Sequence, residues 1–177
     1  MADDEVVALF DSGGAVCGSA RRVRVRAENL RHGATGVLVY HPSGRVYVHR
    51  RTATKDVYPG LRDFCCGGVL LAGEEPDDGA AREAFEELGV HGVPLRRLGV
   101  RQYEDPTTRF VCFQYECVYG GDIVWQPEEV ESGGWMTVDG LVEAIRADPS
   151  DFVPDSVEMA LGLVTARAAF GEDPPDA

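Results

Sequence analysis

Alternating apolar and polar positions predict short strands over the first third of the chain. Residues 36–41 are the most apolar of these segments. A Pro-Ser-Gly turn follows them, so residues 45–50 are expected to return as the second strand of a hairpin. A Pro-Gly pair interrupts residues 52–62, which are therefore predicted to be a loop. The predicted strands are residues 6–10, 23–26, 36–41 and 45–50.

The clearest helical pattern begins at Pro76 and ends before Gly89. Proline suits the first helical position, and the two aspartates after it suit the positive end of the helix dipole. Glycine at the far end is a common C-terminal stop. The apolar residues spaced i, i+3, i+4 and i+7 are expected to form the buried stripe, and they are Ala81, Ala84, Phe85 and Leu88.

The second half of the chain continues to mix the two periodicities. Every second residue from 111 to 119 is apolar or aromatic, which predicts a long strand, and residues 135–138 lead into the next predicted helix. Helices are expected over residues 139–146 and 155–170. Strands interspersed with helices favour a mixed sheet with helices on its faces.

Composition narrows the class of protein. With 177 residues and 44% apolar content, the chain is predicted to be one domain over residues 1–177, with flexible ends at about 1–4 and 171–177. Thirty acidic residues against 17 basic ones give a net charge of −13, which argues against binding a nucleic-acid polymer. The sequence contains no apolar run long enough to span a membrane. Its acidic N-terminus is unlike a secretory signal, which indicates a cytoplasmic protein.

The five cysteines suggest neither a disulfide framework nor a zinc site. Their number is odd, and none of them forms a Cys-x-x-Cys pair. They are predicted to be reduced and mostly buried. They are Cys17, Cys65, Cys66, Cys112 and Cys117.

Three glutamates are distinguished by their spacing. Glu83, Glu86 and Glu87 stand at i, i+3 and i+4, so they project from one face of the predicted helix, opposite the apolar stripe. Carboxylates at these spacings repel one another, and a hard divalent cation removes the repulsion because carboxylate oxygens are its preferred ligands. A solvated acidic face is the alternative interpretation of the same cluster.

The three glutamates belong to a longer pattern. Gly68, then five residues, Glu74, then seven residues, and the segment 82–90 reading Arg-Glu-Ala-Phe-Glu-Glu-Leu-Gly-Val match the box of the Nudix hydrolase family. Every fixed residue is present without a gap. Ala84 is the one departure, because the family usually has a larger aliphatic residue there. The chain therefore resembles a Nudix hydrolase.

The resemblance implies a fold and a metal site. Nudix domains are of the α/β class, an α/β/α sandwich with a mixed β-sheet, and the box forms a loop and helix over the sheet. By position, the metal ligands would be Glu83, Glu86 and Glu87, with the backbone carbonyl near Gly67. The implied cofactor is Mg²⁺ or Mn²⁺, which polarises phosphoryl oxygens and lowers the pKa of bound water.

The resemblance also implies supporting and catalytic roles. Arg82 and Glu74 would pair and, with Gly68, hold the loop against the helix. Glu86 and Glu87 are the candidates within the box for the carboxylate that takes a proton from water. A further acidic group often comes from a later loop in this family, and Glu129 is the main candidate. Its neighbours Glu128 and Glu131 are the alternatives, and a solvated loop is the alternative for all three.

Residues outside the box resemble one branch of the family, the branch that includes isopentenyl-diphosphate isomerase. In that enzyme an arginine and a lysine at the positions of Arg51 and Lys55 hold the substrate diphosphate. The same pair here is the candidate for phosphate contacts, since arginine gives bidentate contacts and lysine a point charge. Surface cations that balance an acidic protein are the alternative.

Three functions from different classes follow from these patterns. The favoured one is metal-dependent hydrolysis of a diphosphate linkage in a nucleotide-type small molecule. An isomerase acting on an allylic diphosphate is disfavoured, because the sequence lacks histidine between His49 and His91, where that enzyme uses one. A non-catalytic nucleotide-binding module is also disfavoured, since such modules usually lose box carboxylates. A homodimer is compatible with the resemblance.

Overall fold

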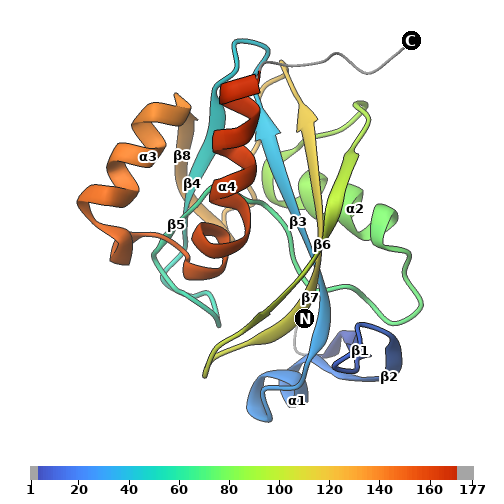
Figure 1. Ribbon diagram of the computed structural model, residues 1–177. Helices are drawn as coiled ribbons and strands as arrows, with labels where there is room; N and C mark the ends of the chain where they lie inside the picture. Colours follow the sequence, from blue (N-terminus) through green and yellow to red (C-terminus); the bar gives the residue numbers. More distant parts are fainter. Residues whose placement is uncertain (1–3, 171–177) are drawn as a thin grey trace.

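The computed structural model describes residues 4–170 and places helices on both faces of a mixed eight-stranded sheet (Figure 1). The helix α2 (Pro76–Leu88) packs on one face, while α3 (Val138–Ala147) and α4 (Pro154–Phe170) pack on the other. The predicted α/β/α arrangement with a mixed sheet is thus confirmed. Apart from Asp4, the ends predicted to be flexible lie outside the described residues. The remaining elements are β1 (Val6–Phe10), β2 (Val16–Arg21), α1 (Arg22–Ala27), β3 (His32–Tyr40), β4 (Val46–Arg51), β5 (Arg62–Asp63), β6 (Arg96–Glu104), β7 (Arg109–Val118), β8 (Val130–Met136) and the 3-10 turn Pro149–Asp151.

The central strand β3 has two different edges. Along one edge it pairs in parallel with β7 over its full length, and β7 pairs in turn with β6. The other edge is shared by three segments. One register pair joins β3 to β1 near its start, and Tyr40 pairs with Val46 of β4 at its end. Between them, bridges at Ala34–Val69 and Val37–Cys66 attach the segment that leads into α2. The connection before the helix therefore lies in the plane of the sheet.

The core follows from the alternation of β3. Val37 and Val39 face the cluster that contains Ala84 and Leu88 of α2, while Leu38 and Tyr40 face the cluster beneath α3 and α4. Because both faces of the sheet are covered, the middle of β7 is buried on both sides, whereas the sequence showed only its alternation. Among residues 4–170, no helix is long and apolar enough to cross a membrane. The cysteines are unpaired, and three of the five are buried.

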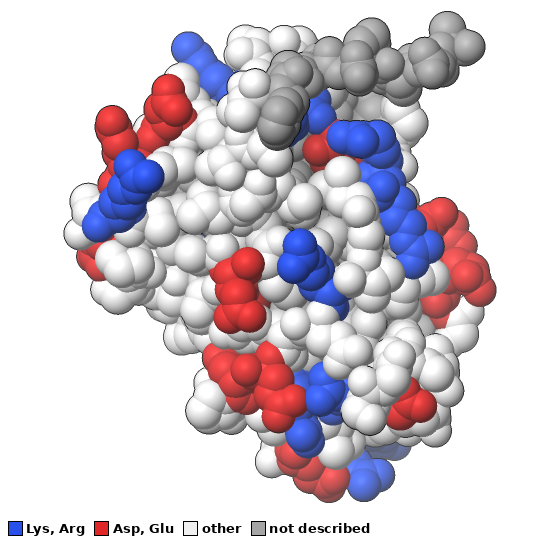
Figure 2. Space-filling view, viewed as in Figure 1, with Lys and Arg blue, Asp and Glu red and all other residues white. Residues whose placement is uncertain are grey.

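The N-terminal part differs from the prediction in one element. Residues 23–26, predicted to be a strand, lie in the helix α1. The strand that pairs with β1 is β2 instead, and it ends at Arg21. The alternating Arg-Val sequence fits both structures, because helical spacing still places Val25 in the core and the guanidinium groups of Arg22 and Arg26 beside Asp56. Figure 2 shows basic and acidic groups in contact around this lower part of the molecule.

The helix α2 also corrects the predicted buried stripe. Phe85 is 57% exposed and Ala81 is exposed, so neither belongs to the core. Ala80, Ala84 and Leu88 form the buried row instead. This rotation of the helix turns two of its three site glutamates toward the sheet, contrary to the expectation that all three face away from the stripe.

Candidate functional site

Local sequence fixes where the site helix begins and ends. Pro76 stands at the first turn, and Gly89 adopts the left-handed conformation with φ 70° that ends the helix. The amide of Gly89 donates to the carbonyl of Phe85, and the amide of Val90 to that of Ala84. The glutamates at 83, 86 and 87 therefore occupy the last two turns of a well-defined helix.

Arg82 joins the loop to the helix. Its guanidinium group makes two hydrogen bonds to the carboxylate of Glu74, of 2.8 and 3.0 Å, so the ion pair expected between them is present. Arg82 also donates to Glu83 at 2.7 Å and to Glu86 at 3.2 Å. Glu74 accepts in addition from the amide of Leu71 at 2.9 Å. One arginine thus orients carboxylates on both sides of the turn that precedes α2.

Glu87 is buried, the side chain of Glu83 is 13% exposed, and that of Glu86 is about half exposed. Burial raises the pKa of Glu83 above its ordinary value. It raises the pKa of Glu87 to about 7, and the nearby Glu83 carboxylate acts in the same direction. The amide of Gly67 donates to Glu87 at 2.9 Å. A side-chain carbon at Gly68 would lie 2.5 Å from the carboxyl group of Glu83, so only glycine leaves room for this packing.

Lys55 connects the box to the later loop. Its ammonium group forms an ion pair with Glu129 and lies 3.8 Å from Glu87. Of the three acidic candidates in that loop, Glu129 is therefore the one that reaches the box. Lys55 is the only lysine in the sequence and is largely buried. Burial, followed by the charge of Arg51, lowers its pKa to about 8.

Arg51 makes contacts different from those of Lys55. Its guanidinium group is 3.8 Å from Asp63 and donates to the carbonyl of Val57 at 3.0 Å. Both Arg51 and Lys55 line a cavity that also includes Gly67 and Gly68. The structure thus brings the two candidate phosphate contacts to the same cavity, next to the loop that touches Glu83 and Glu87.

The donor groups present suit a hard divalent cation. Buried carboxylates with raised pKa values are stabilised when a cation lies between them, and oxygen ligands are those that Mg²⁺ and Mn²⁺ prefer. Within residues 4–170, no three acidic, histidine or cysteine side chains converge in the way a bound metal ion requires. Arg82 holds Glu83 and Glu86, and Lys55 lies beside Glu87. A cation would therefore compete with these two side chains for the carboxylates.

The raised pKa of Glu87 has an expected effect on stability. Its pKa in the folded state, about 7, exceeds its ordinary value of 4.5, so the folded protein loses stability as the pH rises through 7. In the absence of divalent cations, Glu87→Gln should therefore raise the free energy of unfolding by about 1–3 kcal/mol at pH 8 and by little at pH 5. Urea unfolding at both pH values measures the difference. A mutant less stable than the wild type at pH 8 would contradict this prediction.

Comparisons with known proteins place the site in context. The family profile described as NUDIX domain matches residues 30–156. The chain is 38% identical over 172 residues to the "Uncharacterized Nudix hydrolase YfcD" of Salmonella typhi, covering 97% of this chain and 91% of that protein. It is 40% identical over 164 residues to the "Uncharacterized Nudix hydrolase orf19" of Rhodococcus erythropolis, covering 86% and 88%. The fold is similar to the crystal structure of DR0079 from Deinococcus radiodurans, with a TM-score of 0.73 and 24% identity over 92% of this chain and 98% of that one.

Proposed function

This chain belongs to the Nudix family and is a Nudix hydrolase, and on that premise we propose that it hydrolyses a diphosphate linkage in a nucleotide-type substrate with Mg²⁺ or Mn²⁺. The observation that carries the proposal is the buried carboxylate of Glu87 and the partly buried one of Glu83, near Lys55 and Arg51. Anionic ligands for a cation and cationic groups for phosphate thus meet at one place. We propose that the substrate diphosphate lies between them.

Each site residue has a proposed role. Glu83, Glu86 and Glu87, with the carbonyl of Gly67, would hold the divalent cation, which when bound supplies charge neutralisation and a more acidic water. Lys55 and Arg51 would bind the phosphate oxygens and orient the P–O–P bridge. A carboxylate would accept the proton from the attacking water, and Glu86, Glu87 and Glu129 are the candidates. Arg82, Glu74 and Gly68 would hold the loop in position.

The resemblance to the isomerase branch supports the assignment of Arg51 and Lys55 and no more. Thr108 and Phe110 occupy the positions where the isomerase has its acidic pair, and neither side chain can serve as an acid or as a metal ligand. We therefore propose hydrolysis rather than isomerisation. We also propose, from the sequence, a cytoplasmic enzyme that acts on small molecules, and a homodimer is compatible with the family resemblance.

A substrate panel tests the proposed function. Nucleotide sugars, dinucleotides, and nucleoside di- and triphosphates are incubated with Mg²⁺ or Mn²⁺, and the phosphorylated products are identified by chromatography. We expect at least one compound to be cleaved at its diphosphate bridge, and chelation of the metal to abolish the reaction. Release of no phosphorylated product from any compound would refute the proposal. Isomerisation of isopentenyl diphosphate without such release would point to the other branch instead.

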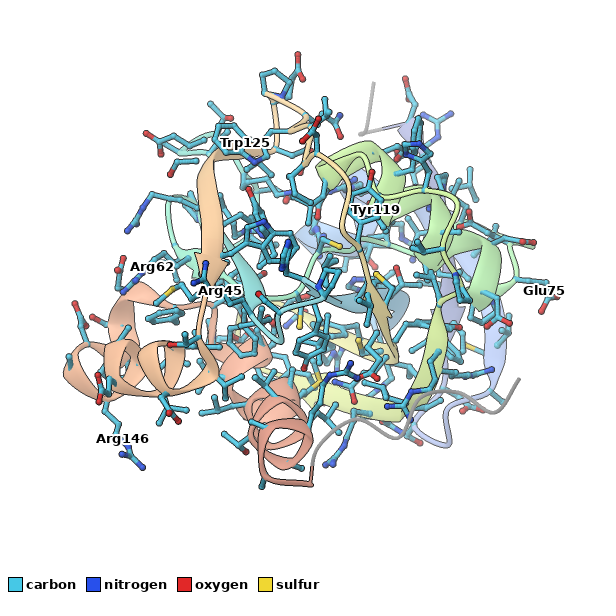
Figure 3. All side chains as sticks on the ribbon, turned by 90° about the horizontal axis from the view of Figure 1, so that it is seen from above. Arg45, Arg62, Glu75, Tyr119, Trp125 and Arg146 are labelled. Atoms are coloured by element: carbon cyan, nitrogen blue, oxygen red, sulfur yellow. The ribbon has the colours of Figure 1, made fainter. Side chains whose placement is uncertain are left out.

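Removal of the Lys55 charge is expected to weaken substrate binding. Lys55→Met keeps the length of the side chain but removes the ammonium group, so the KM for a diphosphate substrate should rise by about tenfold or more. Arg45→Met is the control, since Arg45 lies in the exposed turn after β3, as Figure 3 shows. Steady-state kinetics at saturating metal measure both variants. An unchanged KM in Lys55→Met would remove Lys55 from the phosphate contacts.

A further inference from the structure

The cavity beside the candidate site extends away from the glutamates. One end is formed by Gly67, Gly68 and Lys55, which touch or adjoin the box carboxylates. The other end lies between the first turn of α4 and the strands β3 and β7. The cavity volume of about 120 Å³ is small compared with sites that enclose a whole drug-sized ligand. It suits one group of a substrate rather than the entire molecule.

Two carboxyl groups line the far end. Asp63 is 5% exposed and accepts hydrogen bonds from the hydroxyl of Ser156 at 2.6 Å and from the amide of Cys65 at 2.9 Å. Asp155 stands beside it, and Ser156 is the one hydrogen-bond partner of its carboxyl group seen within residues 4–170, at 3.3 Å. No ion pair to Asp155 occurs within the same residues. Burial, with repulsion from Asp63, raises the pKa of Asp155 to about 7. This carboxyl group therefore has unused acceptor capacity inside a cavity.

A second unsatisfied group lines the same cavity. The residue Thr35 is 5% exposed, and its hydroxyl has no hydrogen-bond partner among the described residues. Buried polar atoms without partners are rare in folded proteins and call for an explanation. The rest of the lining is mixed: it includes polar side chains such as His32 and Gln114, and apolar ones such as the ring of Phe110. Other apolar lining residues are Val57, Val153 and Met159.

We propose that this cavity receives an amino-substituted heterocyclic base of the substrate, and that Asp155, next to Asp63, accepts hydrogen bonds from the amino group. This inference rests on the proposed function, because it names the group that is attached to the substrate diphosphate. A ring fits against the apolar side chains of the lining, and its N–H donors fit the two carboxyl groups. An isoprenoid tail offers no donor to the remaining acceptor capacity of Asp155, so it would place an apolar group against a polar one, which is unfavourable.

Matched nucleotides test the inference. CDP carries an amino group on the base where UDP carries a carbonyl group, and GDP carries an amino group that IDP lacks. We expect the amino-bearing member of at least one pair to have a Kd about 10- to 100-fold lower, measured by calorimetry with Mg²⁺. The corresponding preference in kcat/KM should be similar. Asp155→Asn should reduce that preference by about tenfold, because an amide offers a different set of donors and acceptors. Asp139→Asn, a change of an exposed aspartate in the first turn of α3, should retain it.

A second variant covers the case in which Asp155→Asn does not fold. Ala34 lines the cavity from β3, so Ala34→Leu should fill it. This variant should weaken binding of the preferred nucleotide while leaving binding of tripolyphosphate, which has no base, unchanged. Equal Kd values within both nucleotide pairs would overturn the inference even if hydrolysis is observed. If hydrolysis is absent but one pair shows the amino preference, the cavity assignment stands and the proposed reaction fails.

Discussion

Glu87→Gln is expected to lower kcat for the preferred diphosphate substrate by about 10²–10⁴-fold, the range over which a positioned proton acceptor acts. The effect should be large because Glu87 is the most buried of the box carboxylates and touches both the Gly67 amide and the Lys55 ammonium group. Glutamine preserves the shape and can still accept from Gly67. The substitution therefore removes the charge that binds the cation or takes the proton, and steady-state kinetics at saturating metal and substrate measure the loss.

Two comparisons make this result interpretable. Glu158→Gln changes an exposed glutamate of α4 and should leave kcat unchanged. Metal titration separates the two roles of Glu87. If its main role is to bind the cation, more Mg²⁺ or Mn²⁺ should partly restore the rate. If it accepts the proton, the rate should stay low at every metal concentration. Full activity of Glu87→Gln at ordinary metal concentrations would remove it from the active site.

Gly67→Ala is expected to have the largest effect on stability, lowering the free energy of unfolding by about 3 kcal/mol or more. Gly67 has φ 151°, a conformation that L-residues rarely adopt. A side-chain carbon there would also lie 2.1 Å from the carbonyl oxygen of Thr35, which is backbone of the central strand and cannot move aside. Urea or thermal unfolding, followed by circular dichroism, measures the change.

A second glycine separates the cost of the backbone conformation from the cost of the close contact. Gly44 has φ 80°, but nothing lies within 4 Å of the position that a side-chain carbon would take. Gly44→Ala should therefore show the conformational strain alone, about 1 kcal/mol. If both variants lose the same amount of stability, the close contact with Thr35 contributes nothing. The backbone at Gly67 would then be less constrained than the structure indicates.

Much of the fold could be predicted from local patterns, because apolar periodicity reflects which face of an element is buried. The strands β1, β3, β4 and β7 and the three long helices were located this way, whereas β2 and the nine-residue β6 were not predicted. The strand predicted from the Arg-Val alternation of residues 23–26 was wrong, because a six-residue helix and a strand can both bury Val25. The predicted burial of Phe85 was wrong for a different reason. Its hydrophobicity predicted burial, but the helix is turned so that Phe85 lies against His91 at the surface.

The candidate site contains residues that are close in the sequence and residues that are far apart in it. Glu74, Arg82 and the box glutamates lie within one short segment. Helical spacing predicted that the three glutamates share a face, and the family resemblance implied the pair of Arg82 and Glu74. Lys55 and Glu129 were selected separately and meet in an ion pair that no local pattern contains. Asp63 and Asp155 could not be selected at all. They come from a two-residue strand and the start of a helix, where an aspartate usually serves as an ordinary first-turn residue.

The attachment of the segment before α2 to the edge of β3 bears on how the enzyme would open and close. Cys66 and Val37 exchange two backbone hydrogen bonds, and the amide of Leu70 donates to Gly33. We therefore expect slow hydrogen–deuterium exchange across residues 66–70, although they form no regular strand. A preorganised loop of this kind loses little conformational entropy when ligand arrives. We therefore expect this loop to keep its conformation during turnover rather than to open and close.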